Sequence, residues 1–349
     1  MVYNKFSDYL KNKYGSKVYK LPVNLCTTCP NRAGKGGGAN DARDDDAEKA
    51  AGTGAGAPDA DGIPHGIPVG AGGCIFCGDE GADFELLSPQ MSITAQLESN
   101  RRYIGEKYKA DKYIAYFQNY SNTYLPLRSF TEAMKEACAD SIVALYISTR
   151  PDCIDDARIG FLKQLKEEKG VDIVVELGLQ SVNPSTLRWL KRGHGIAEFI
   201  DAVLKLKRNG IEVCAHMIND LPADDTGDVI EGAKLLSALQ IDQVKCHSLY
   251  ILENTELGEL YKKGGFKPLE MDDFIERTIL FLEYLSPDIV VQRLIGRAPA
   301  ERTLFCSWNT SWRKIHDMIV EKMQSEGRYQ GSHFDYLNGS ALRGMDNSQ

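Results

Sequence analysis

The sequence predicts an α/β protein, a partial (βα)6 TIM-like barrel of parallel strands with helices outside, and three observations support this prediction. Short runs rich in β-branched residues alternate with longer amphipathic stretches along most of the chain. Successive apolar runs are spaced by roughly 30 residues, which is the length that a βαβ unit requires. The runs are nearly continuous in apolar residues, which is typical of parallel strands covered by helices.

Seven apolar runs are the candidate strands, the last being the weakest: 18–25, 113–118, 142–148, 172–180, 211–218, 243–249 and 288–294. Seven amphipathic stretches are the candidate helices: 89–108, 127–139, 155–168, 196–209, 226–240, 271–285 and 311–323. Because the last strand is weak, the count is about six, which favours a partial barrel. In such folds the ligand site lies at the carboxyl ends of the strands.

Residues 33–73 interrupt this alternation with a segment of Gly, Ala and Asp, scattered Pro and no aromatic residue. Such a composition buries too little apolar surface to offset the entropy of ordering. We therefore expect a flexible loop insertion, with an acidic partner-binding arm as the alternative. The predicted organisation is a barrel domain over 1–310 that contains this insertion, followed by a C-terminal helical extension over 311–349.

The formal net charge is −8, and the 33–73 segment carries half of it, with seven acidic against three basic residues. An acidic balance argues against a protein that coats nucleic acid through a basic surface, although it leaves room for a local basic groove. No apolar run approaches the roughly 20 residues that span a bilayer. The amino terminus lacks the pattern of a secretory signal. We expect a cytoplasmic protein without membrane contact.

Four of the nine cysteines form two C-x2-C pairs, Cys26 with Cys29 and Cys74 with Cys77. In a reducing compartment such pairs indicate metal or redox chemistry rather than disulfides. Four thiolates at this spacing fit a tetrahedral zinc site. Three of them, Cys29, Cys74 and Cys77, fit a [4Fe-4S] cluster that keeps one iron open. Cys29 follows the first predicted strand, where a barrel places its catalytic loops, and this position favours the cluster.

Nine segments carry a resemblance to a known family: FSDYLKNKYGSKVYKLPVN at the start, TCPNRAG at 28–34, GGCIFC at 72–77, YFQNYSNTY at 116–124, STRPDC at 148–153, ELGLQSV at 176–182, RGH at 192–194, AHMINDLP at 215–222 and YILENTELGELYKKGGFKP at 250–268. With them the chain resembles the radical S-adenosylmethionine superfamily. Within it, the chain is similar to compact bacterial proteins related to the radical domain of the Elongator catalytic subunit. The similarity covers nearly the whole chain outside the insertion.

The resemblance implies that Cys29, Cys74 and Cys77 bind a [4Fe-4S] cluster and that Cys26 is dispensable. It implies that S-adenosylmethionine completes the fourth iron and is cleaved reductively to a 5'-deoxyadenosyl radical. It also implies an electron donor such as a flavodoxin or ferredoxin. A tRNA wobble uridine is the substrate that the resemblance suggests, with a peptide or a small metabolite as alternatives. No acetyltransferase activity like that of the Elongator subunit is expected, because the chain ends at Gln349.

Polar residues at the ends of the predicted strands, and one carboxylate within a strand, are the candidate cofactor contacts: Gln118, Asn119, Thr149, Arg150, Glu176, Gln180, Ser181 and His216. Arg150 suits a carboxylate or phosphate, with a salt bridge as the rival role. Glu176 is costly to bury unless it is paired. Each of these polar groups has a structural alternative, namely to satisfy loop backbone. No catalytic residue is assigned, and a four-cysteine zinc-binding structural or interaction protein is the competing hypothesis.

Overall fold

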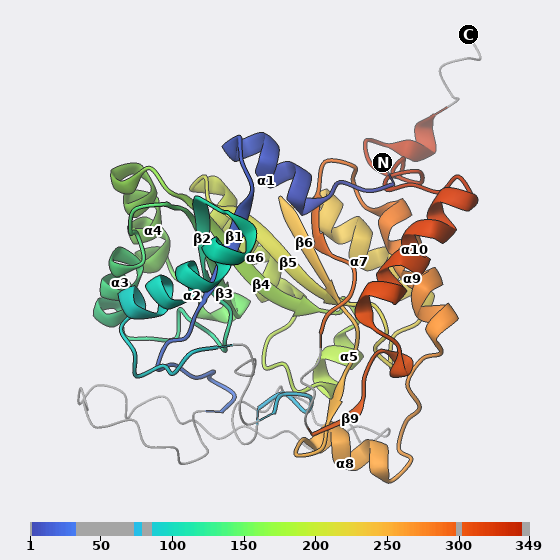
Figure 1. The fold of residues 1–349 in the computed structure, drawn as a ribbon. Helices are drawn as coiled ribbons and strands as arrows, with labels where there is room; N and C mark the ends of the chain where they lie inside the picture. Colours follow the sequence, from blue (N-terminus) through green and yellow to red (C-terminus); the bar gives the residue numbers. More distant parts are fainter. Residues whose placement is uncertain (1, 33–72, 79–85, 298–301, 344–349) are drawn as a thin grey trace.

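A curled sheet of seven parallel strands with helices outside it forms the body of the protein in the computed structural model (Figure 1). The structure describes residues 2–32, 73–78, 86–297 and 302–343. The predicted insertion at 33–73 lies outside the described residues, except for Gly73. Within the part of the chain that the structure describes, no helix is long and apolar enough to cross a membrane.

The strands follow the chain across the sheet in the order β1-β2-β3-β4-β5-β6-β8. Their bounds are β1 Val18–Val23, β2 Lys112–Phe117, β3 Ile142–Thr149, β4 Asp172–Gln180, β5 Glu212–Ile218, β6 Gln243–His247 and β8 Val290–Arg293. Every neighbouring pair is parallel. The predicted partial barrel is confirmed, and the weak run at 288–294 contributes a seventh strand to it.

The helices that connect or follow these strands are α2 Ile93–Tyr108, α3 Leu127–Glu136, α4 Asp156–Lys169, α6 Ile196–Arg208, α7 Thr226–Ala238, α9 Met271–Tyr284 and α10 Trp312–Ser325. Each lies within or close to a predicted amphipathic stretch. The additional elements are α1 Phe6–Tyr14, α5 Pro184–Trp189, α8 Glu256–Lys262, the short helices η2 Pro151–Cys153, η3 Ser307–Asn309 and η4 Ser340–Leu342, and a two-stranded sheet of β7 Ile251–Leu252 and β9 Thr303–Phe305.

Alternation along the strands separates two cores on the two faces of the sheet. The outer face packs against the helices and forms the main apolar core, which includes Phe117, Ile147 and Val175. The inner face carries a smaller core inside the curl, which includes Tyr116 and Tyr146. The inner face also carries charged residues, so the interior of the half-barrel is only partly apolar.

Helix α1 lies at the upper end of the sheet in Figure 1, where it packs against the edge strands β1 and β8 and reaches the amino ends of β4 and β5. The Tyr9 hydroxyl donates to Glu212 at 3.1 Å and the Tyr14 hydroxyl donates to Asp172 at 2.7 Å. These two carboxylates are the first residues of β5 and β4. The amino end of the barrel is therefore closed by a helix, which leaves the carboxyl ends of the strands for ligands.

The predicted C-terminal extension packs against the barrel. Ile315, Ile319 and Met323 of α10 are fully buried and belong to the main apolar core. Arg328 follows the helix and its guanidinium donates two hydrogen bonds to Glu283 of α9, at 2.7 and 3.0 Å. The residues before and after position 310 therefore belong to one apolar core, and a domain boundary at this position is a proposal that rests on the sequence alone.

Candidate functional site

Three of the four paired cysteines line one cavity at the carboxyl ends of the strands. Cys29 comes from the loop after β1, and Cys74 and Cys77 come from a turn on the far side of the insertion. That turn is closed by the Cys77 backbone N–H, which donates to the Cys74 carbonyl at 3.0 Å. Gly73 N–H also donates to the Asn31 carbonyl at 2.8 Å, which joins the two cysteine segments.

The C-x2-C turn is held in place by elements that surround it. Ile75 is almost fully buried in a separate apolar cluster with Leu190, Ile251 and Leu257. Its backbone N–H donates to the Leu190 carbonyl at 3.2 Å, and its carbonyl accepts from the Leu257 N–H at 2.8 Å. The small elements α5, β7 and α8 thus position the turn, and α5 and α8 are labelled in the lower part of Figure 1.

Two arginine guanidinium groups contact cysteine sulfurs. Arg192 Nη1 lies 3.2 Å from the Cys74 Sγ, and Arg150 Nη1 lies 3.5 Å from the Cys29 Sγ. A hydrogen bond from Cys77 and the positive charge of Arg192 hold the pKa of the Cys74 thiol well below its usual range. The same hydrogen bond and burial raise the pKa of Cys77. Because a thiolate is the form that binds metals, the site favours the ligating state of Cys74.

Cys26 does not join the other three cysteines. Its side chain is exposed, does not line the cavity, and donates to the Pro89 carbonyl at 3.2 Å. Sulfurs that share one zinc ion at about 2.3 Å each lie roughly 3.8 Å apart. Among the described residues, no group of three cysteine sulfurs lies within 4.8 Å of one another. Cys26 is therefore separate from the three cysteines of the cavity, which argues against a zinc site that uses all four thiols.

The structure brings all but one of the predicted cofactor contacts to the same cavity. Its walls include the polar side chains predicted from the strand ends and from mid-β4, namely Gln118, Asn119, Thr149, Arg150, Glu176, Gln180 and His216. Arg150 also forms a salt bridge, the alternative role considered for it, because its guanidinium pairs with the Asp152 carboxylate at 2.5 and 2.8 Å. The cavity is thus polar on the strand side and sulfur-lined on the loop side.

Ser181 is the predicted contact that the structure does not bring to the cavity. Its hydroxyl donates to Asp224 at 3.0 Å and accepts from the Asn183 N–H at 2.9 Å, so it supports the loop after β4. The neighbouring Gln180 has a positive φ of 77°, at an irregularity in the β4–β5 register. Such a bulge re-aims side chains, and here Gln180 faces the cavity while Ser181 does not.

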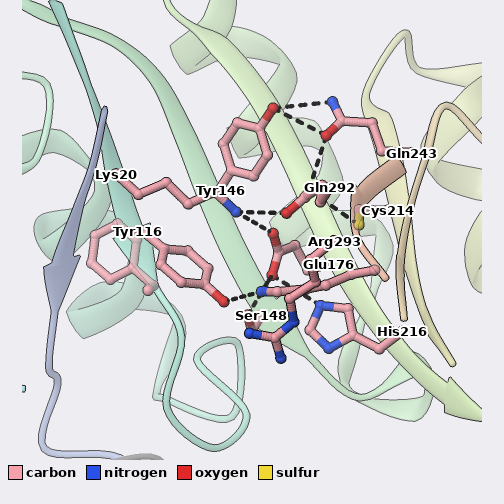
Figure 2. Close-up of polar contacts among 12 residues, drawn as sticks. Lys20, Tyr116, Tyr146, Ser148, Glu176, Cys214, His216, Gln243, Gln292 and Arg293 are labelled. Atoms are coloured by element: carbon pink, nitrogen blue, oxygen red, sulfur yellow. Dashed lines mark hydrogen bonds and ion pairs between the residues drawn. The ribbon is translucent and has the colours of Figure 1, made fainter. Parts of the chain in front are cut away.

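Glu176 lies inside the curl of the sheet and is fully buried (Figure 2). Its Oε1 accepts from Lys20 Nζ at 2.9 Å, and its Oε2 accepts from Lys245 Nζ at 3.0 Å. Ser148 and His216 also contact Oε2, at 3.1 and 2.9 Å. The two lysine charges hold the pKa of this carboxyl well below its usual range against the opposing effect of burial. Glu176 is therefore ionised and fully paired.

Three cationic residues at this site are not identified by the sequence analysis. Arg192 occurs in the RGH segment, but only its contact with Cys74 gives it a role. Lys20 and Lys245 sit within apolar strands, and a lysine in such a run is itself a signal of a buried partner. His194, in the same segment as Arg192, contacts it at 3.0 Å and helps to orient it.

Comparison with known proteins agrees with this geometry. Residues 67–247 match the model of the radical SAM superfamily, and residues 241–325 match that of the radical SAM C-terminal domain. A half-barrel with three converging cysteines at its mouth is the arrangement of an S-adenosylmethionine radical enzyme. The chain belongs to the radical S-adenosylmethionine superfamily of enzymes, whose members typically bind a [4Fe-4S] cluster and S-adenosylmethionine.

Relatives extend over nearly all of the chain. The protein YtqA of Bacillus subtilis is 30% identical over 336 residues, which cover 96% of this chain and 94% of YtqA. A tRNA uridine(34) acetyltransferase of Methanocaldococcus infernus is 34% identical over 179 residues, which cover 49% of this chain and 32% of that protein. The Elp3 structure from the same archaeon matches with a TM-score of 0.60 at 22% identity, over 70% of this chain and 62% of that one, and supports the fold.

Proposed function

We propose that this protein binds a [4Fe-4S] cluster through Cys29, Cys74 and Cys77 and uses it to cleave S-adenosylmethionine. The observation that carries the proposal is the convergence of these three thiols, from two distant segments, on one cavity with an arginine at two of the sulfurs. When bound, the cluster supplies an electron that breaks the sulfonium bond and yields a 5'-deoxyadenosyl radical.

The chain's own residues prepare this cavity in three ways. Arg150 and Arg192 contact the Cys29 and Cys74 sulfurs, and each is fixed by a second contact, to Asp152 and to the Gly178 carbonyl. The polar ends of the strands provide donors and acceptors for the amino, carboxylate and ribose groups of a nucleoside sulfonium. Phe76 and Tyr250 also line the cavity, and their rings add apolar surface to its walls.

The donor set fits an iron–sulfur group by a test that is independent of the relatives. The Asn31 side-chain amide donates to the Lys191 and Arg192 carbonyls, at 2.8 and 3.0 Å, and approaches the Cys74 Sγ at 3.8 Å. Hydrogen bonds to ligating sulfurs are a recognised means of tuning such clusters. The Asn31 Oδ1 atom is buried without a partner among the described residues. One hydrogen-bond acceptor beside the thiols is therefore unused.

Two finer aspects belong to the same proposal. A tRNA uridine is the first substrate to test, because a named relative is a tRNA uridine(34) acetyltransferase that shares about half of this chain. A flavodoxin or ferredoxin is the proposed electron donor, since the reaction needs single electrons at low potential. We place the reaction in the cytoplasm, where the nine free cysteines stay reduced.

The proposal is tested on protein purified and reconstituted without oxygen. We expect about four irons and four sulfides per chain, and an electron paramagnetic resonance signal of the reduced cluster that shifts when S-adenosylmethionine is added. With dithionite or a reduced flavodoxin, 5'-deoxyadenosine should accumulate, and bulk tRNA added to the same reaction should gain a modified uridine if the substrate proposal holds. One zinc per chain without iron would overturn the proposed function.

Gly193 provides a prediction about the packing beside the cluster site. It has a φ of 72°, and a Cβ there would lie 2.5 Å from the Asn31 Oδ1 and 2.9 Å from the Arg150 Nη2. We expect Gly193→Ala to lower the iron retained after reconstitution, because the methyl group displaces two residues that contact the ligating sulfurs. The measurement is iron content per folded chain.

The matched control is Gly210→Ala. Gly210 has a similar φ of 68° but no neighbour within 4 Å of an added Cβ. Both variants incur the roughly 1–2 kcal/mol cost of a left-handed alanine, and only Gly193→Ala adds the collision. Equal iron retention in the two variants would contradict the prediction.

A further inference from the structure

We propose that the interior of the half-barrel, next to the cofactor cavity, binds an anionic group of the substrate, a carboxylate or a phosphate, through Arg293. This inference rests on the proposed function in taking the neighbouring cavity as the cofactor site. Arg293 is the last residue of β8, at the edge of the sheet, and Figure 2 shows it beside the network around Glu176.

The first argument is the balance of charge inside the curl. Lys20, Lys245 and Arg293 bring three positive charges to this layer, and Glu176 is the only carboxylate that pairs with them among the described residues. Both oxygens of Glu176 are already used by the two lysines. Arg293 makes no ion pair with any residue that the structure describes. A partly buried cation without a counter-charge is costly unless a ligand supplies one.

The second argument is the set of contacts that Arg293 does make. Its Nη2 lies 2.6 Å from the Nδ1 of His247, so its hydrogen-bonding partner is an imidazole rather than an anion. Burial, together with the charges of Arg293 and of the surrounding cations, holds the pKa of His247 well below its usual range, so the ring is neutral. The Nε atom of Arg293 is buried and has no partner among the described residues. A guanidinium with free donors binds carboxylate or phosphate oxygens in a two-pronged geometry.

The third argument is continuity with the cofactor cavity. His216 lines that cavity, and its ring centroid lies 5.2 Å from that of His247, which contacts Arg293. The arginines that contact the cysteine sulfurs come instead from the loops after β3 and β4. The two cationic regions are therefore supplied by different parts of the sheet, and for this reason the proposal assigns an anion at Arg293 to the substrate rather than to the cofactor.

The test uses the full chain with its reconstituted cluster, and inorganic phosphate and acetate as separate probes at constant ionic strength. We expect one or both of these anions to raise the thermal midpoint relative to chloride, and the stronger probe indicates which anionic group the substrate carries. Arg293→Gln should weaken the affinity for that probe at least about tenfold, the usual size of a lost charge-assisted contact. Arg293→Lys should weaken it less, because the charge is kept. Arg128→Gln, at an exposed position on α3, is the control and should leave the affinity unchanged.

Two results would overturn the inference. One is an anion affinity that does not change in Arg293→Gln or, if that variant does not fold, in Arg293→Met, which also removes the charge. The other is competition between the anion and S-adenosylmethionine, with a matching loss of S-adenosylmethionine affinity in the variant, which would assign Arg293 to the cofactor's own carboxylate. Iron content and 5'-deoxyadenosine formation, measured on the same wild-type sample, report separately on the proposed function.

Discussion

Replacing Cys29, Cys74 or Cys77 with alanine is expected to reduce reconstituted iron from about four atoms per chain to fewer than one, whereas Cys26→Ala should retain the full amount. The three cysteines line one cavity, and two of their sulfurs contact arginines. Each thiolate is one of only three protein ligands, so the loss of any one leaves a cluster with too few attachments to persist. Iron and sulfide analysis, with the visible absorption of the cluster, measures the effect.

Cys26→Ala is the matched control for this experiment, because Cys26 is three residues from Cys29 and its thiol donates to the Pro89 carbonyl rather than facing the cavity. All four variants should keep the wild-type far-ultraviolet circular dichroism after anaerobic purification. If Cys26→Ala loses metal as completely as the variants of Cys29, Cys74 and Cys77, the metal has four cysteine ligands. That result would favour the four-cysteine zinc site.

The second large effect is expected from Glu176→Gln, which should lower the free energy of unfolding by about 3–5 kcal/mol, the usual result of breaking a buried ion pair. Glutamine keeps the shape of the side chain but leaves Lys20 and Lys245 without their shared counter-charge. Urea denaturation of the variant and the wild type, followed by circular dichroism, gives the difference.

Glu132→Gln is the control for Glu176→Gln, because Glu132 also pairs with a cation but is exposed on α3. An exposed pair of this kind contributes little to stability, because water and salt screen the two charges. The double variant of Glu176→Gln and Lys20→Met should recover part of the lost stability, because one of the two unpaired charges is removed. A Glu176→Gln protein as stable as the wild type would show that the lysines find other compensation, and it would weaken the charge argument made for Arg293.

Much of the fold could be predicted from the sequence because the strands are local signals. The runs at 142–148 and 172–180 correspond to β3 and β4 within one residue, since near-continuous apolar stretches of that length are typical of buried parallel strands. Helix α5 could not be predicted because six residues are too few to show a helical period. Helix α1 is not among the predicted helices, although Phe6, Tyr9, Leu10 and Tyr14 recur at helical spacing and pack in the inner core.

Most residues of the candidate site could likewise be predicted from the sequence, and one could not. The positions of the strand ends follow from the sequence, so Gln118, Thr149, Gln180 and the three cysteines are predictable at one edge of the sheet from the chain alone. The exception is Ser181, which is adjacent to Gln180 but turns to Asp224 at the bulge. A single irregular residue reverses the side to which the next one points, and no sequence pattern announces it.

The sequence by itself therefore determined the parallel α/β architecture, the edge of the sheet that holds the site and the cysteines that meet there. Only the tertiary structure decided which charges face one another inside the curl, such as Lys20 and Glu176, which are 156 positions apart. Alternation along a strand reveals which residues share a face. The curvature of the sheet decides which strands bring their inner-face side chains close together. That curvature arises from the packing of the whole chain.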